Sequence, residues 1–144
     1  MHLTLRVQPG IRYLRAQRQS KVIVDAIRAV QTDDFQVVDY VILGNHLHLI
    51  AEAQNANALS RAMQRLGIRI AKQLNSLQNR RGPVFVDRYH GHTLTTRREV
   101  AHATRYLRNN HRRHTREYLP PRWRDPLAAR VARPRTWLLA TSPP

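Results

Sequence analysis

Residues 35–53 read FQVVDYVILGNHLHLIAEA. Two runs rich in β-branched and apolar residues flank the pair Gly44-Asn45, which is typical of a tight two-residue turn. The pattern therefore predicts a β-hairpin. Side chains alternate between the two faces of a strand, so His46 and His48 are expected on one face and Leu47 on the other. If the turn has two residues, Asp39 on the first strand shares the face of the histidines.

The segments on either side of this hairpin predict a small α+β fold. Leu3, Leu5 and Val7 alternate with polar residues, as in a half-buried strand. Apolar spacing predicts helices over residues 20–31, with Ser20 as N-cap, and over 57–79. A strand is expected within 84–94, and a last helix runs from about residue 97 to between 111 and 114. The order β-α-β-β-α-β-α is that of a ferredoxin-like split β-α-β fold, with a four-stranded antiparallel sheet and the helices on one face.

The chain ends in a segment of different composition. Residues 119–144 are rich in proline and arginine, and we expect them to form an irregular C-terminal tail anchored by Trp123 and Trp137. The domain that precedes this tail is predicted to span residues 1–118. A length of 144 residues fits one such domain with its tail.

Charge is the strongest compositional signal. The chain holds 25 Lys and Arg against 9 Asp and Glu, a formal net charge of +16. Residues 80–144 hold 15 of the basic and 4 of the acidic residues. This excess predicts a polyanionic partner that binds mainly to the second half of the chain. The absence of cysteine excludes disulfides and thiolate metal sites. No apolar run is long enough to span a bilayer, so we expect a cytoplasmic protein without a membrane partner, associated with the nucleoid when bound to DNA.

The residues that could carry chemistry lie on the second hairpin strand and the last helix. His46 and His48 can share one divalent cation, although two hydrogen-bonded or exposed histidines would give the same spacing. Asp39 is either a partner of these histidines or an ordinary surface residue. Tyr106 and Asn110 are four residues apart and therefore share a helix face.

Each of these two helix residues has two interpretations. Tyr106 can be a packing residue with a solvated hydroxyl, or a nucleophile that attacks phosphorus. Asn110 can cap the helix, or offer an amide oxygen to Mg²⁺ or Mn²⁺. Tyr89 is the rival nucleophile, but a strand residue in a basic block more often packs or stacks on a base. The other tyrosines, which we expect to be structural, are Tyr13, Tyr40 and Tyr118.

Three blocks of sequence carry a resemblance to a known family. Residues 39–50 (DYVILGNHLHLI), 82–90 (GPVFVDRYH) and 105–110 (RYLRNN) resemble the single-tyrosine HUH transposases, particularly the REP-associated tyrosine transposases. The resemblance covers roughly residues 3–115. It implies that His46, His48 and Asn110 hold a metal ion and that Tyr106 is the nucleophile. Relatives commonly have Asn-Pro where this chain has Asn110 and His111, so its helix is expected to continue farther, and the tail from Pro120 onward matches nothing in the family pattern.

The resemblance implies a metal-dependent endonuclease and strand transferase that acts on single-stranded DNA, at hairpin or repeat ends. Tyr106 would form a 5′-phosphotyrosine and release a 3′-hydroxyl, with Mg²⁺ or Mn²⁺ as cofactor. One such tyrosine per chain means that two DNA ends require a homodimer or sequential reactions. The arginines expected to contact DNA phosphates are Arg88, Arg97, Arg98, Arg105, Arg108, Arg112 and Arg113.

Two other interpretations remain open at the level of sequence. A non-catalytic nucleic-acid-binding protein on the same fold would also explain the charge. A domesticated HUH nuclease with a host role would keep the chemistry without mobility. Dependence on a divalent ion distinguishes the binding protein from either nuclease, because a simple binder is indifferent to chelator.

Overall fold

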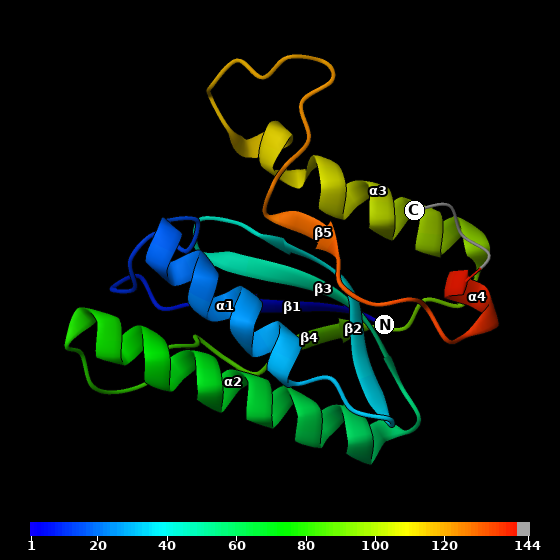
Figure 1. Cartoon of the computed structure of the whole chain (residues 1–144), viewed down its shortest axis with the longest axis horizontal. Helices are drawn as coiled ribbons and strands as arrows, with labels where there is room; N and C mark the ends of the chain where they lie inside the picture. Colours follow the sequence, from blue (N-terminus) through cyan, green and yellow to red (C-terminus); the bar gives the residue numbers. More distant parts are fainter. Residues whose placement is uncertain (141–144) are drawn as a thin grey trace.

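The computed structural model describes residues 1–140, except for the side chains of Trp137 and Ala140. Five strands form one antiparallel sheet in the order β4-β1-β3-β2-β5 (Figure 1). The strands are β1 (His2–Arg6), β2 (Phe35–Ile42), β3 (His46–Ala53), β4 (His90–His92) and β5 (Ala128–Arg130). The predicted hairpin is β2–β3, and its strand β3 lies at the centre of the sheet.

Two helices cover one face of this sheet, α1 (Gln17–Ala29) and α2 (Ala56–Gln78) (Figure 1). The core between them contains Leu3 and Leu5 of β1, Leu47 and Leu49 of β3, and the apolar stripes of both helices. Each large aliphatic side chain buried here contributes about 1.5–3 kcal/mol. Within α2 this stripe consists of Leu59, Ala62, Met63, Leu66, Ile70 and Leu74.

The third long helix, α3 (Arg97–His114), lies on the opposite face of the sheet (Figure 1). Its buried residues Val100, Ala103 and Leu107 pack against Val41 and Ile50, which belong to β2 and β3. The helix begins with a capping box in which the Thr96 hydroxyl accepts from the Glu99 N–H, and the Glu99 carboxylate accepts from the Thr96 N–H. Since α3 packs against β2, β3 and β5, the β1–β4 side of this face keeps exposed residues, including His90 and His92.

The predicted α+β split β-α-β fold is confirmed, with differences in detail. The sheet has a fifth strand, β5, and α3 lies on the face opposite α1 and α2 rather than beside them. Helical periodicity shows which residues of a helix are buried, but not which face of the sheet buries them. The strand expected within 84–94 is reduced to β4, preceded by an isolated bridge from Phe85 to Val7.

The first helix also begins earlier than predicted. It starts at Gln17 after Ala16, and Ser20 lies inside the helix, where its hydroxyl donates to the Gln17 carbonyl. Serine bonds equally well to a backbone group within the first turn, so its presence did not fix the helix start.

The segment after α3 packs onto the sheet instead of remaining wholly irregular. Its strand β5 pairs with β2, and it continues to a short helix, α4 (Trp137–Ala140). Arg15 and Asp125 form a bidentate ion pair at 2.8 and 3.0 Å, almost completely buried. Trp123 lies near the Arg112 guanidinium, 5.8 Å from the ring centroid. The expected anchoring role of the Trp137 side chain lies outside the described residues, as do residues 141–144.

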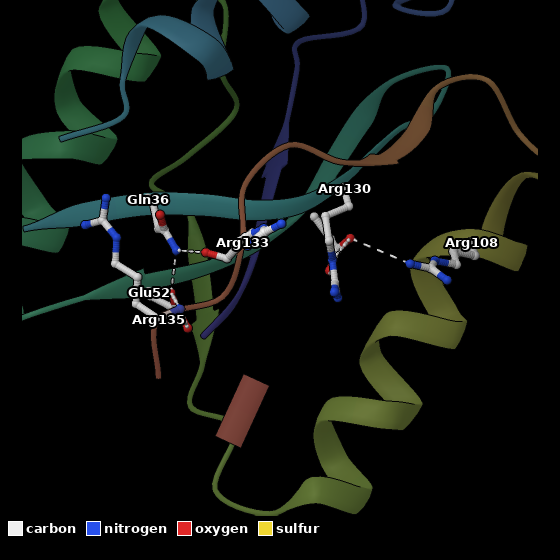
Figure 2. Close-up of polar contacts among 7 residues, drawn as sticks. Gln36, Glu52, Arg108, Arg130, Arg133 and Arg135 are labelled. Atoms are coloured by element: carbon white, nitrogen blue, oxygen red, sulfur yellow. Dashed lines mark hydrogen bonds and ion pairs between the residues drawn. The ribbon is translucent and has the colours of Figure 1, made fainter. Parts of the chain in front are cut away.

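Two buried carboxylates hold the last part of this segment (Figure 2). Glu52 accepts hydrogen bonds from the backbone N–H groups of Arg135 and Thr136 and from the amide of Gln36. Asp39 accepts from the Arg130 guanidinium at 3.1 and 3.3 Å, and Arg108 lies 3.9 Å from it. Asp39 is therefore buried and paired with arginines, so it is not the surface residue considered from the sequence.

Candidate metal and tyrosine site

The histidine pair lies directly after the β2–β3 turn, on the face of the sheet that α3 covers. The turn consists of Gly44 and Asn45, and the Leu43 N–H donates to the His46 carbonyl at 2.9 Å to close it. His48 pairs with Val41, a residue packed against α3, which confirms the predicted alternation. The two imidazole centroids are 5.0 Å apart. The histidines are therefore adjacent and held by regular strand pairing.

Hydrogen bonds at the Nδ1 atoms orient both rings. His46 Nδ1 donates to the Asn45 side-chain oxygen at 2.8 Å, because that oxygen can only accept. His48 Nδ1 lies 3.0 Å from both His2 Nε2 and Thr4 Oγ1, and with its proton on Nδ1 both of these atoms can accept. In this tautomer each Nε2 atom presents a lone pair. His48 Nε2 is buried and has no hydrogen-bond partner within the described part of the chain.

Burial keeps both imidazoles neutral. It lowers the pKa of His46 to about 4, with smaller contributions from the nearby Arg6 and His114. It lowers the pKa of His48 to about 3, with additional contributions from His2, His46, Arg6 and His114. Neutral imidazole is the form that binds a metal ion, so at pH 7 neither ring has to lose a proton first.

Tyr106 extends from α3 toward the histidines. Its ring stands edge-on to that of His48, with centroids 5.2 Å apart and planes at 77°. It also lies 5.9 Å from the ring of His2, and its side chain is half-buried. Tyr89, the rival, packs against the core on the other face of the sheet. Of these two tyrosines, Tyr106 is the one whose ring contacts the histidine pair.

Asn110 lies one helical turn beyond Tyr106 and is completely buried. Because α3 continues to His114, Asn110 does not cap the helix, and the expected continuation past residue 110 is confirmed. Neither its Oδ1 nor its Nδ2 atom has a hydrogen-bond partner among residues 1–140. A buried amide without partners costs about 1–3 kcal/mol per unsatisfied group, so the protein retains it at a loss of stability.

These atoms are suited to a hard divalent cation. Two imidazole nitrogens and an amide oxygen form an acceptable donor set for Mg²⁺ or Mn²⁺. Among residues 1–140, no three histidine or acidic side chains are placed so that together they could hold a metal ion. His48 Nε2 and Asn110 Oδ1, which are buried and have no hydrogen-bond partner among residues 1–140, are the candidate donor atoms for such an ion.

The arginines expected to contact DNA fall into two groups. Arg108 and Arg112 are engaged within the protein, Arg108 near Asp39 and Arg112 with the carbonyls of Leu119 and Pro120. The other five are exposed, but they do not form one cluster. Arg88 lines a groove with Tyr89 and with Ile68, a residue of α2, and this groove lies away from α3. The exposed arginines are Arg88, Arg97, Arg98, Arg105 and Arg113.

Sequence reasoning missed several residues around the histidines. His2 and Thr4 contact His48 directly, and Arg6 is paired with His46 in the β1–β3 register. His90 and His92 of β4 pair with Thr4 and His2, so they share that face. The alternation of β1 contains a signal, because His2, Thr4 and Arg6 alternate with the buried Leu3 and Leu5. What the sequence lacked was the pairing of β1 with β3.

Comparison with known proteins supports the fold. No family model matches the chain. No curated protein matches it either. Among solved structures, the chain is similar to a REP-associated tyrosine transposase bound to a REP hairpin, with 21% identity and a TM-score of 0.58 over 78% of this chain and 66% of that one. The chain thus has the fold of a REP-associated tyrosine transposase, and the match spans about two thirds of that protein. No helix within residues 1–140 is long and apolar enough to cross a membrane.

Proposed function

We propose that the chain is a metal-dependent endonuclease and strand transferase that cleaves single-stranded DNA through Tyr106. The observation that carries this proposal is the contact between Tyr106 and His48. The Nε2 atom of His48 is buried and has no hydrogen-bond partner among residues 1–140. The similar transposase is bound to a REP hairpin, and the charge of +16 on this chain suits a nucleic-acid ligand. A hairpin or repeat end is therefore the substrate that we propose.

His46, His48 and Asn110 would hold Mg²⁺ or Mn²⁺. Such an ion, when bound, neutralises charge on the scissile phosphate and polarises it toward attack. The chain itself supplies the nucleophile: the Tyr106 oxygen forms a bond to phosphorus while the bond from phosphorus to the 3′-oxygen breaks. The phenol proton leaves to solvent, and the departing 3′-oxygen takes up a proton to become a hydroxyl.

The product is a 5′-phosphotyrosine, which conserves the energy of the broken bond. Attack by a 3′-hydroxyl on this phosphotyrosine joins the strand to a new end and regenerates the tyrosine. Each chain contributes one such tyrosine. Two DNA ends therefore require two subunits or two successive reactions.

The test is formation of a covalent adduct between the protein and a labelled hairpin oligonucleotide with a single-stranded flank, resolved on a denaturing gel. The wild-type protein should form the adduct with Mn²⁺ and lose it with chelator. Tyr106→Phe should abolish the adduct while the affinity for the oligonucleotide stays within about twofold, because one hydroxyl contributes little to the phosphate-dominated binding. Tyr89→Phe is the matched control and should retain the adduct.

Tight DNA binding without any adduct, unchanged by chelator, would indicate the non-catalytic binding protein instead. An adduct of normal yield in Tyr106→Phe would assign the nucleophile to another residue.

A further inference from the structure

A cavity of about 560 Å³ lies beside His46, the first residue of the histidine pair. It is formed by the β2–β3 turn, the loop before α1, the last turn of α3 and residues 115–117 that follow this helix, all at the same end of the sheet (Figure 1). His46 lines this cavity, together with Tyr13, His114, Arg116 and Glu117. A volume of several hundred Å³ is typical of sites for small organic groups, so it can accommodate a nucleobase.

Tyr13 gives the cavity an aromatic wall. Tyr13 is 56% exposed. The ring lies directly over Gly44, where a Cβ atom would stand only 2.7 Å from Tyr13 Cε2. The Leu14 N–H also donates to the Gly44 carbonyl at 2.9 Å. Glycine in the turn therefore permits this close approach, and the neighbouring backbone bond holds the loop in place.

The polar residues of the cavity suit a nucleotide. Arg116 and His114 are exposed and can contact phosphate, whereas Glu117 offers a carboxylate that can accept from the N–H groups of a base edge. The Glu117 backbone is itself held, since its N–H donates to the Thr115 hydroxyl at 3.2 Å. An aromatic surface, a basic rim and one acceptor are the combination by which proteins bind unpaired bases.

The position of the cavity relative to the histidines indicates which nucleotide of the DNA would enter it. His46 belongs both to the proposed metal site and to the lining of the cavity. A DNA strand whose scissile phosphate lies at His46 and His48 therefore has a neighbouring nucleotide at the entrance of the cavity. We propose that this cavity binds the nucleobase that flanks the scissile phosphate, stacked on Tyr13 and read by Glu117. This inference rests on the proposed function, and adds that the protein itself selects the base at the cleavage position.

Stacking can be measured without cleavage. The full-length protein would be titrated, in chelator, into oligonucleotides with 2-aminopurine on one or the other side of the cleavage position. Stacking on Tyr13 should quench the emission at one of the two positions. Tyr13→Ala should abolish this quenching, Tyr13→Phe should retain it, and Tyr118→Ala is the control because Tyr118 is 85% exposed and does not line the cavity.

Base selection is measured by adduct formation with every base at that position. Loss of the stacking surface in Tyr13→Ala should lower the yield on the preferred base by about tenfold. Glu117→Gln should change which base is preferred, because an amide presents a donor where the carboxylate only accepts. Unaltered quenching and unaltered base preference in Tyr13→Ala would overturn the proposal.

The two proposals fail in different ways. If the wild-type protein forms no adduct but still quenches 2-aminopurine through Tyr13, the nuclease function is wrong and base binding stands. If the adduct forms normally and Tyr13 affects neither readout, the nuclease function stands and the base-binding site is wrong.

Discussion

At the scale of single residues, the candidate site keeps buried polar atoms without partners, at a cost in stability. The buried amide of Asn110 and the Nε2 atom of His48 have no partners among residues 1–140. Much of the site was predictable from sequence, because strand alternation placed His46 and His48 together and the helical period placed Tyr106 and Asn110 on one face. The contacts of His2 and Thr4 with His48 were not predictable, because these two residues precede His48 in the sequence by 46 and 44 positions.

Substitution of Asn110 directly tests this cost in stability. In chelator, Asn110→Leu should raise the free energy of unfolding by about 1 kcal/mol or more, because it removes a buried amide without partners. Titration with Mn²⁺ should then show that the more stable variant no longer binds the ion at this site. Urea unfolding measures the first effect. A loss of stability in chelator would mean that the amide is satisfied and our interpretation of it is wrong.

The orientation of His48 depends on its partner Thr4. Thr4→Val keeps the shape of a β-branched residue but removes the hydroxyl that contacts His48 Nδ1. Loss of such a hydrogen bond behind a metal-binding histidine weakens metal affinity by about 10–100-fold. Calorimetric titration with Mn²⁺ checks this, with the exposed Thr93→Val as control. Equal affinities in the two variants would show that Thr4 does not orient the ring.

At the scale of elements, tertiary packing determines which face of the sheet each helix covers, and local sequence patterns do not specify this. The spacing of Val100, Ala103 and Leu107 predicted a helix correctly, yet its position on the opposite face follows from an apolar patch on β2 and β3. That patch depends on a register irregularity between Val37 and Asp39, after which the faces exchange. Simple alternation cannot detect such a bulge. The strand β4 was overestimated because only three of its residues pair with β1.

Near the end of β3, the titratable carboxylate of Glu52 holds the C-terminal segment at Arg135 and Thr136. Burial alone would raise the pKa of Glu52, but hydrogen bonds from Thr136, Arg135 and Gln36 outweigh it and lower the pKa below 4.5. A lowered carboxyl pKa stabilises the folded state above pH 4.5, and this contribution disappears as the pH falls through the folded-state value. Urea unfolding below pH 4.5 should therefore show a steeper loss of stability in the wild type than in Glu52→Gln. Parallel profiles would contradict the role of this carboxylate.

At the scale of the whole molecule, the C-terminal segment is part of the fold. Its composition predicted an irregular tail, because short apolar runs separated by proline give no periodic signal. The structure instead places β5 beside β2 and buries Asp125 against Arg15, 110 residues away. The segment also supplies the arginine that neutralises Asp39 on β2. Long-range pairing of this kind depends on contacts that no local window contains.

The Arg15–Asp125 pair should therefore contribute far more than an exposed pair. Arg15→Ala leaves a buried carboxylate without its partner, and should lower the free energy of unfolding by about 3–5 kcal/mol. The control is Lys21→Ala, which breaks the Lys21–Asp25 pair whose side chains are 74% and 46% exposed. That loss should be at most about 1 kcal/mol. Comparable losses in urea unfolding would mean that the C-terminal segment is not anchored as described.

The proposed reaction depends on one atom, the hydroxyl oxygen of Tyr106. The protein would be incubated with Mn²⁺ and a hairpin oligonucleotide with a single-stranded flank, digested with nuclease and trypsin, and examined by mass spectrometry. Our account predicts a nucleotide attached through phosphate to Tyr106, in the tryptic peptide of residues 106–108. Attachment at Tyr89 or any other residue, or no attached nucleotide although the DNA is bound, would contradict it.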